Sequence, residues 1–100
     1  MKVQLVFFDG CPNAKAAREA LTRALEAEGM AVEFEEFDSQ SESAPADLRG
    51  WGSPTVLING VDVTGERIPN GSSCRLYQNP DNKGVPSDES IRRALRAGQQ

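Results

Sequence analysis

The hydrophobic pattern of residues 1–37 changes from strand-like to helical and back to strand-like, which strongly restricts the possible folds. Residues 3–8 (VQLVFF) form a nearly continuous apolar run, typical of an interior strand covered on both faces. Residues 13–28 show helical spacing, and Gly29 suits the position that follows a helix C-terminus. Residues 31–37 indicate a second strand. This order predicts two parallel strands joined by a right-handed helical crossover.

Two details within this unit give further expectations. In the helix, Glu19 and Arg23 are four residues apart, so we expect them to form an ion pair. In the second strand, Val32 and Phe34 should face one side of the sheet, but residues 35–37 (EEF) interrupt the alternation. We therefore expect a bulge or an early strand end at residues 35–37.

The rest of the chain predicts a hairpin, a long loop and a final helix. Residues 55–58 (TVLI) and 61–64 (VDVT) indicate strands, and the Asn-Gly pair at 59–60 between them is a strong signal for an antiparallel hairpin. Residues 65–86 are rich in Gly and Pro and have no periodicity, and a loop of this length is usually functional or disordered. Ser87 is placed to cap the last helix.

This order of elements is that of the minimal thioredoxin-like (glutaredoxin-like) fold. It predicts an α/β domain with a four-stranded mixed sheet in the strand order 2-1-3-4, flanked on both faces by helices. Ser43 is placed to cap a short helical turn through residues 47–49, between the second and third strands. Residues 1–100 are enough for a single domain with one core.

The composition excludes several classes of function. The chain has two cysteines and no histidine, which excludes Ser-His-Asp and Cys-His catalysis and zinc sites of cysteine and histidine, and we expect no cofactor. A net charge of −4 argues against a nucleic-acid partner. No apolar stretch approaches the roughly 20 residues that span a membrane. The N-terminal residues lack the apolar region of a signal peptide, so we expect a cytoplasmic protein whose disulfides are transient and redox-active.

Cys11 is the first candidate for chemistry, because it lies in a Gly-Cys-Pro sequence between the first strand and the first helix. A thiol at a helix N-terminus is close to free backbone N–H groups, and this setting favours the nucleophilic thiolate. Pro12 suits the first helical position, where a missing N–H group costs nothing. The alternative is that Cys11 is a small apolar residue packed at the strand end.

Pro54 marks a second candidate segment at the start of the third strand. Proline belongs at a strand start or in a cis peptide bond, although an ordinary proline at the end of a loop is the alternative. In the thioredoxin fold a cis proline at this place lies beside the cysteine of the first helix. By this analogy, Ser53 would present its backbone to an extended substrate. Trp51 is interpreted equally well as core packing and as a wall of the site.

The long loop carries the second cysteine, Cys74. This residue can act as a resolving thiol if its Cα atom comes within about 7 Å of that of Cys11, and otherwise it is a buried loop anchor. Arg75 would favour a thiolate or bind an anionic ligand, whereas Asp9 opposes thiolate formation. For Arg75 and Tyr77, a surface charge and a packing ring are the favoured interpretations.

Several segments together resemble one known family. They are GCPN at 10–13, GSPTV at 52–56, NGVDV at 59–63, SCRLY at 73–77 and the helix start PSDE at 86–89. In this combination and order they resemble small bacterial thioredoxin-like proteins, some of which carry the label alkylmercury lyase. The resemblance covers nearly the whole chain and implies a thioredoxin fold and a thiol role for Cys11 and Cys74. Thioredoxins carry Cys-x-x-Cys, whereas Ala14 stands three residues after Cys11 here, so dithiol exchange within the first helix is excluded.

We therefore expect a thiol–disulfide oxidoreductase that acts on a disulfide-containing or oxidised thiol substrate. Cys11 would attack the substrate sulfur, and Cys74 would resolve the mixed disulfide. The expected substrate-binding residues are Pro12, Trp51, Ser53, Pro54 and Arg75. Two alternatives remain open: a non-catalytic module that binds a peptide at Pro54, and a soft-metal binder that holds Hg²⁺ or Cu(I) between two thiolates.

Overall fold

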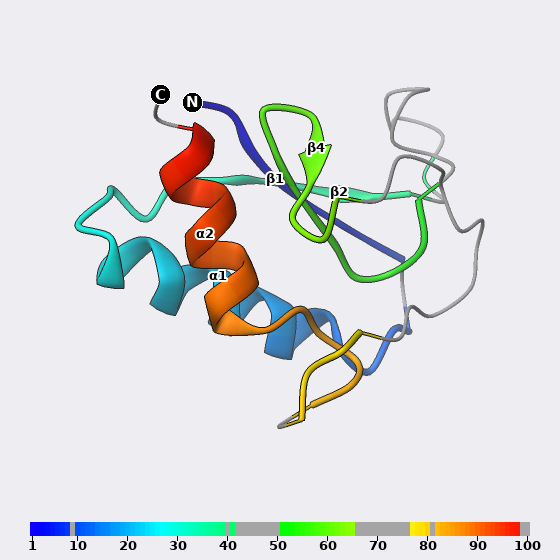
Figure 1. Cartoon of the computed structure of the whole chain (residues 1–100). Coiled ribbons are helices and arrows are strands. Elements are labelled where there is room, and N and C mark those ends of the chain that lie inside the picture. The colour runs from blue at the N-terminus through cyan, green and yellow to red at the C-terminus, as the bar shows by residue number, and fades with distance from the viewer. Residues whose placement is uncertain (9, 40, 42–50, 66–76, 81, 99–100) are drawn as a thin grey trace.

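The computed structural model describes residues 1–8, 10–39, 41, 51–65, 77–80 and 82–98 (Figure 1). In the described part, one sheet contains four strands in the order β2-β1-β3-β4, with β1 and β2 parallel and the other neighbours antiparallel. The elements are β1 (Val3–Phe7), α1 (Ala14–Ala27), β2 (Glu35–Asp38), β3 (Thr55–Ile58), β4 (Val61–Asp62) and α2 (Asp88–Gly98). The α/β class and the strand order 2-1-3-4 predicted from the sequence are confirmed.

The second strand is where the sequence prediction was wrong. Strand β2 begins at Glu35, opposite Gln4 of β1, so the acidic segment that was expected to break the strand is the strand itself. Residues 31–34 precede it, and the N–H of Glu33 donates to the carbonyl of Ala31 (3.0 Å), which folds the chain into a tight turn. β2 is an edge strand, where exposed acidic side chains are common because they discourage further strand pairing.

The β3–β4 hairpin confirms the Asn-Gly signal. Asn59 has φ 53° and Gly60 has φ 82°, so both central residues have the positive φ that a type I′ turn requires. The Asn59 side chain also ties the two ends of the described chain together: its Oδ1 accepts from the N–H of Lys2 (2.8 Å), and its Nδ2 donates to the carbonyl of Gly98 (3.2 Å). Strand β4 is shorter than expected, because the Asp62 carboxylate bonds the N–H and hydroxyl of Thr64 and turns the chain.

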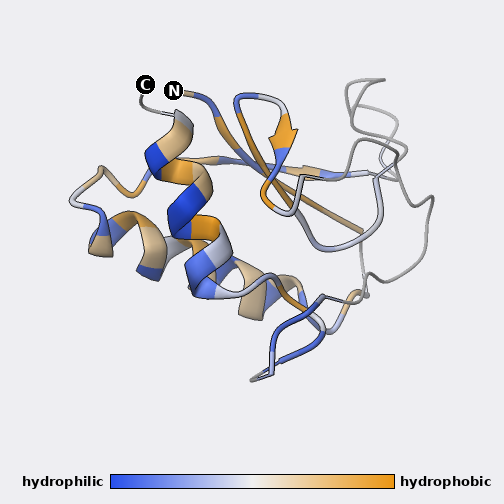
Figure 2. Ribbon diagram, viewed as in Figure 1, coloured by the Kyte–Doolittle hydropathy of each residue, from blue (hydrophilic) through white to orange (hydrophobic). Residues whose placement is uncertain are grey.

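The core consists of two hydrophobic clusters, one on each face of the sheet. The larger cluster combines alternate residues of β1 and β3 with the apolar faces of α1 and α2, and both helices lie on this same side of the sheet (Figure 1). In the described part of the chain, helices therefore cover only one face of the sheet, whereas the sequence predicted helices on both faces. Its fully buried side chains include Leu5, Leu21, Val56, Ile91 and Leu95. Figure 2 shows the alternation of hydrophilic and hydrophobic positions along α2 that this packing requires. The helical turn expected at 47–49 lies outside the described residues.

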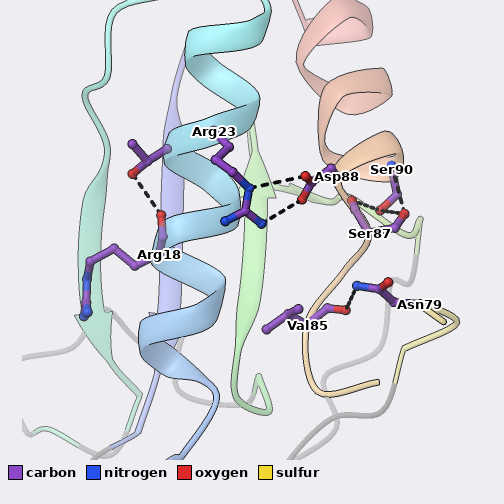
Figure 3. A network of polar contacts seen from close by, with 8 residues as sticks. Arg18, Arg23, Asn79, Val85, Ser87, Asp88 and Ser90 are labelled. Carbon is purple, nitrogen blue, oxygen red and sulfur yellow. Dashed lines mark hydrogen bonds and ion pairs between the residues drawn. The ribbon is translucent and has the colours of Figure 1, made fainter. Parts of the chain in front are cut away.

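The two helices are also joined by ion pairs. Arg23 of α1 donates to the Asp88 carboxylate of α2 at 3.2 and 3.4 Å, and this hydrogen bonding raises the pKa of Arg23 (Figure 3). The charge of Glu19 also raises the pKa of Arg23, as its expected pairing implies, but the hydrogen-bonded partner of Arg23 is Asp88 on the other helix. Glu28 at the end of α1 accepts from Arg92 (2.7 Å) and Arg96 (3.1 Å) of α2.

The start of α2 confirms the expected cap. The Ser87 hydroxyl oxygen accepts from the N–H of Ser90 at 3.1 Å, which satisfies one of the free donors of the first turn (Figure 3). Neither of the described helices is long and apolar enough to cross a membrane.

Candidate functional site

The first candidate residues meet at one end of the sheet. Val6 pairs with Thr55, so the end of β1 lies beside the start of the antiparallel strand β3. Cys11 follows β1, and the Ser53–Pro54 segment precedes β3, which brings both to this end of the sheet. The sequence prediction that these two segments converge is consistent with this register.

Two consecutive backbone turns hold Cys11 in place. The N–H of Cys11 donates to the carbonyl of Phe8 (3.2 Å), and Gly10, with φ +85°, occupies the third position of this turn. The carbonyl of Cys11 then accepts from the N–H of Ala14 (3.4 Å). Asn13 has φ −99° and ψ 0°, the values of the third residue of a type I turn.

This second turn corrects the expected role of Pro12. Helix α1 begins at Ala14, so Pro12 is the second residue of the turn and not the first residue of the helix. Proline fits both positions, because each needs φ near −65° and neither uses the N–H group. Pro12 is exposed, and Cys11 is a free, partly exposed thiol that lies two residues before the N-cap of α1.

The Ser53–Pro54 peptide bond is cis, as the position of Pro54 suggested. However, Ser53 is 0% exposed and Pro54 is also fully buried, so neither residue is open to a ligand here. The Pro54 carbonyl accepts a hydrogen bond from the hydroxyl of Tyr77. The Ser53 hydroxyl is buried without a hydrogen-bond partner among the described residues. The expectation that Ser53 presents an accessible docking edge is therefore not met.

Trp51 belongs to the second hydrophobic cluster, on the face of the sheet opposite α1 and α2. It is buried with Val6 and Leu57, and Phe37 packs against them. Of the two interpretations of Trp51, core packing is confirmed.

Tyr77 links residues 77–80 to the start of β3. Tyr77 is 7% exposed, its hydroxyl donates to the Pro54 carbonyl, and its N–H donates to the carbonyl of Lys83 (2.7 Å). The segment continues to Asn79, whose Nδ2 donates to the carbonyl of Val85 at 3.1 Å (Figure 3). The favoured interpretation of Tyr77 as a packing ring is confirmed, but its hydrogen bond to Pro54 had no local signal in the sequence.

The second thiol and its neighbour fall on residues that the structure does not describe. Cys74 and Arg75 lie outside the described residues, as does Asp9, so their proposed roles remain predictions from the sequence. In the described part of the chain, no three Cys, Asp or Glu side chains gather in a group that could hold a metal ion.

A separate pocket of about 440 Å³ lies between α1, residues 79–85 and the start of α2. Its rim carries the Arg23–Asp88 ion pair (Figure 3), and Cys11 and Ser53 do not line it. Three acidic side chains and one basic side chain line this pocket, namely Glu19, Asp88, Glu89 and Arg23. The pocket is therefore distinct from the thiol site.

Comparison with known proteins adds no identification: no protein-family model, curated protein or solved structure matches this chain.

Proposed function

We propose that this protein is a thiol-dependent redox protein with a thioredoxin-like fold, in which Cys11 is the nucleophile. The observation that carries the proposal is the free, partly exposed Cys11 thiol, held by two turns between β1 and the N-terminus of α1. Backbone N–H groups and the dipole at a helix N-terminus favour the thiolate, and the thiolate is the form that attacks disulfides.

The proposed reaction is a thiol–disulfide exchange. The Cys11 thiolate attacks one sulfur of a substrate disulfide, forms a mixed disulfide and releases the other half as a thiolate, which takes a proton from water. The thiolate of Cys74 then attacks the Cys11 sulfur, forms the Cys11–Cys74 disulfide and releases the second half of the substrate. The substrate gains two electrons and the protein loses them, and a dithiol reductant returns both cysteines to the reduced state.

The burial of Ser53 and Pro54 restricts the side from which substrate can reach Cys11. A module that bound peptides through an open edge at Pro54 would need that segment exposed, and it is fully buried. We therefore favour a reaction in which substrate approaches Cys11 over the exposed Pro12 side of the turn. In this reaction Ser53 and Pro54 are buried residues beside the site and do not contact substrate.

The two cysteines offer a matched pair of variants for the test. With a disulfide reagent such as oxidised glutathione, Cys74→Ser should accumulate a mixed disulfide at Cys11, and Cys11→Ser should not accumulate one at Cys74. The reduced native protein should form the Cys11–Cys74 disulfide on mild oxidation, as peptide mass mapping would show. If that disulfide never forms, and if Cys11 alkylates no faster than glutathione, the proposed mechanism is wrong.

A further inference from the structure

The tip of the β3–β4 hairpin carries an Asn-Gly pair, a sequence whose backbone can react with its own side chain. At such a pair the nitrogen of the glycine reaches the asparagine side chain more readily than at other sequences, because glycine has no side chain to obstruct the approach. Asn59 and Gly60 are both exposed, and a Cβ atom built at Gly60 would meet no atom of the described residues within 4 Å. Water therefore has free access to the reacting groups of this turn.

The reaction is a deamidation that consumes only water. The Gly60 nitrogen forms a bond to the Cγ of Asn59, the bond from Cγ to Nδ2 breaks, and the Nδ2 group leaves as ammonia with the proton of the Gly60 nitrogen. Water then opens the resulting five-membered imide at one of its two carbonyl carbons. Opening at one carbon gives aspartate, and opening at the other gives isoaspartate, whose main chain runs through the side-chain carbon. No group is oxidised or reduced.

The folded structure holds the Asn59 side chain away from this reaction. Its Oδ1 accepts from the N–H of Lys2 (2.8 Å), and its Nδ2 donates to the carbonyl of Gly98 (3.2 Å). The N–H of Asn59 also donates to the Lys2 carbonyl (2.7 Å), which fixes the backbone. The positive φ of 53° belongs to a left-handed turn, in which the Gly60 nitrogen points away from the Asn59 side chain. The reaction therefore requires these contacts to be released first.

The contacts of Asn59 exist only while both ends of the described chain lie on the hairpin. Lys2 precedes β1 and Gly98 is the last residue of α2, and Figure 1 shows the two ends close together. A Cβ atom built at Gly98 would lie 2.8 Å from the Cγ2 of Ile58 and 3.2 Å from the Nδ2 of Asn59, so the end of α2 packs tightly on the hairpin. Chain ends are the parts of a fold that open most easily. Their opening releases the Asn59 carboxamide.

We propose that Asn59 is a deamidation site that the fold controls: it reacts in molecules whose chain ends have left the hairpin, and its product prevents those ends from docking again. Isoaspartate adds one carbon to the main chain of a turn that is two residues long and needs left-handed angles at both. The NH2 group that donated to the Gly98 carbonyl has left as ammonia. Deamidation therefore marks opened molecules irreversibly. This inference does not depend on the thiol chemistry proposed above.

The first test compares deamidation of the folded and the unfolded chain at pH 8 and 37 °C, measured by peptide mass mapping and by isoaspartyl methyltransferase labelling. Asn70 precedes the other glycine of an Asn-Gly pair, so in guanidinium chloride Asn59 and Asn70 should react at the same rate. In the folded protein Asn59 should react about 5- to 150-fold more slowly than in the unfolded chain, because two hydrogen bonds must break first. Equal rates for Asn59 in the folded and unfolded chain would overturn the proposal.

Two crowded glycines provide a matched pair of variants. Gly98→Ala places a methyl group against the Asn59 carboxamide, so it should raise the deamidation rate of Asn59 in the folded protein by about two- to tenfold, the effect of losing one hydrogen bond. Gly84→Ala is the control, because a Cβ there would lie 2.2 Å from the Nδ2 of Asn13, away from the hairpin. It should leave the rate unchanged while the protein stays folded. If both variants raise the rate equally, global unfolding governs the reaction and the proposal is wrong.

The last test examines the product and needs no variant. Deamidated protein carries one more negative charge, so anion exchange separates it from the intact protein after ageing. Amide hydrogen exchange at Ala97 and Gly98, in the last turn of α2, should be about two- to tenfold faster in the deamidated protein, because the bond from Asn59 to Gly98 is lost. Exchange at Ile91, in the first turn of α2, should not change. Equal exchange at the end of α2 in both forms would overturn the proposal.

Discussion

The hydrogen bond from Tyr77 to Pro54 makes a sharp prediction about stability. The hydroxyl of Tyr77 donates to the Pro54 carbonyl, and both groups are buried. Tyr77→Phe keeps the ring in the core but removes the donor. The carbonyl then loses this partner in a place where water does not replace it readily.

The expected cost follows from that loss. A buried polar group left without its partner costs about 1–3 kcal/mol. The unfolding entropy of a 100-residue domain is about 0.2 kcal/mol per degree near the melting temperature. Tyr77→Phe should therefore lower the melting temperature by roughly 5–14 °C.

Thermal unfolding followed by circular dichroism, together with urea titration at 25 °C, measures this change. Gln78→Ala is the control, because Gln78 is the exposed neighbour and its replacement should change stability by less than about 0.5 kcal/mol. If Tyr77→Phe melts within about 2 °C of the native protein, the Tyr77 hydroxyl contributes nothing, and our account of how the loop segment is anchored to β3 is refuted.

Three further predictions concern the backbone, the helix pair and the core. Gly10→Ala and Gly29→Ala both place a side chain at a positive φ (+85° and +69°) in open space, so each should cost about 1–2 kcal/mol, but only Gly10→Ala should alter the alkylation rate of Cys11. Hydrogen bonding from Arg92, followed by a second arginine of α2, lowers the pKa of Glu28. Glu28 therefore stabilises the fold above the ordinary glutamate pKa of about 4.3, and its contribution should vanish as the pH falls through the lower folded-state value. The stability difference between native protein and Glu28→Gln, measured by urea titration from pH 7 to pH 2, should shrink in that range; a constant difference contradicts this assignment. Leu21→Ala, at a fully buried position, should cost about 2–5 kcal/mol in the same titration, and a loss below about 1 kcal/mol would show that the site is not tightly packed.

Features set by neighbouring residues could be predicted from the sequence. The Asn-Gly turn, the Ser87 cap and the apolar run of β1 each depend on a few adjacent residues, and each was found where expected. The strand order 2-1-3-4 needed more than these signals: it was predicted because the order of elements is that of the minimal thioredoxin-like arrangement, and the sheet has this order.

The sequence predictions were wrong or incomplete where one local sequence fits two kinds of backbone structure, or where a residue contacts another that is distant in the chain. Pro12 is equally suited to a helix start and to the second position of a type I turn, so its neighbours could not decide between them. The bounds of β2 are set by pairing with β1, because its own acidic sequence has little strand character. The contacts of Tyr77 with Pro54 and of Asn13 with Gly84 join remote segments, and no local pattern indicates them.

The hydrogen bonds of the Asn59 side chain limit which residue can stand at position 59 more than the backbone angles of the hairpin turn do. Glycine would satisfy the backbone angles of the turn, but it would leave the N–H of Lys2 and the carbonyl of Gly98 without the bonds that Asn59 provides. Aspartate could accept from Lys2, but it has no donor for Gly98, and its charge would face the negative end of α2. Only a neutral amide on this short stem serves the turn, the first strand and the last helix at once.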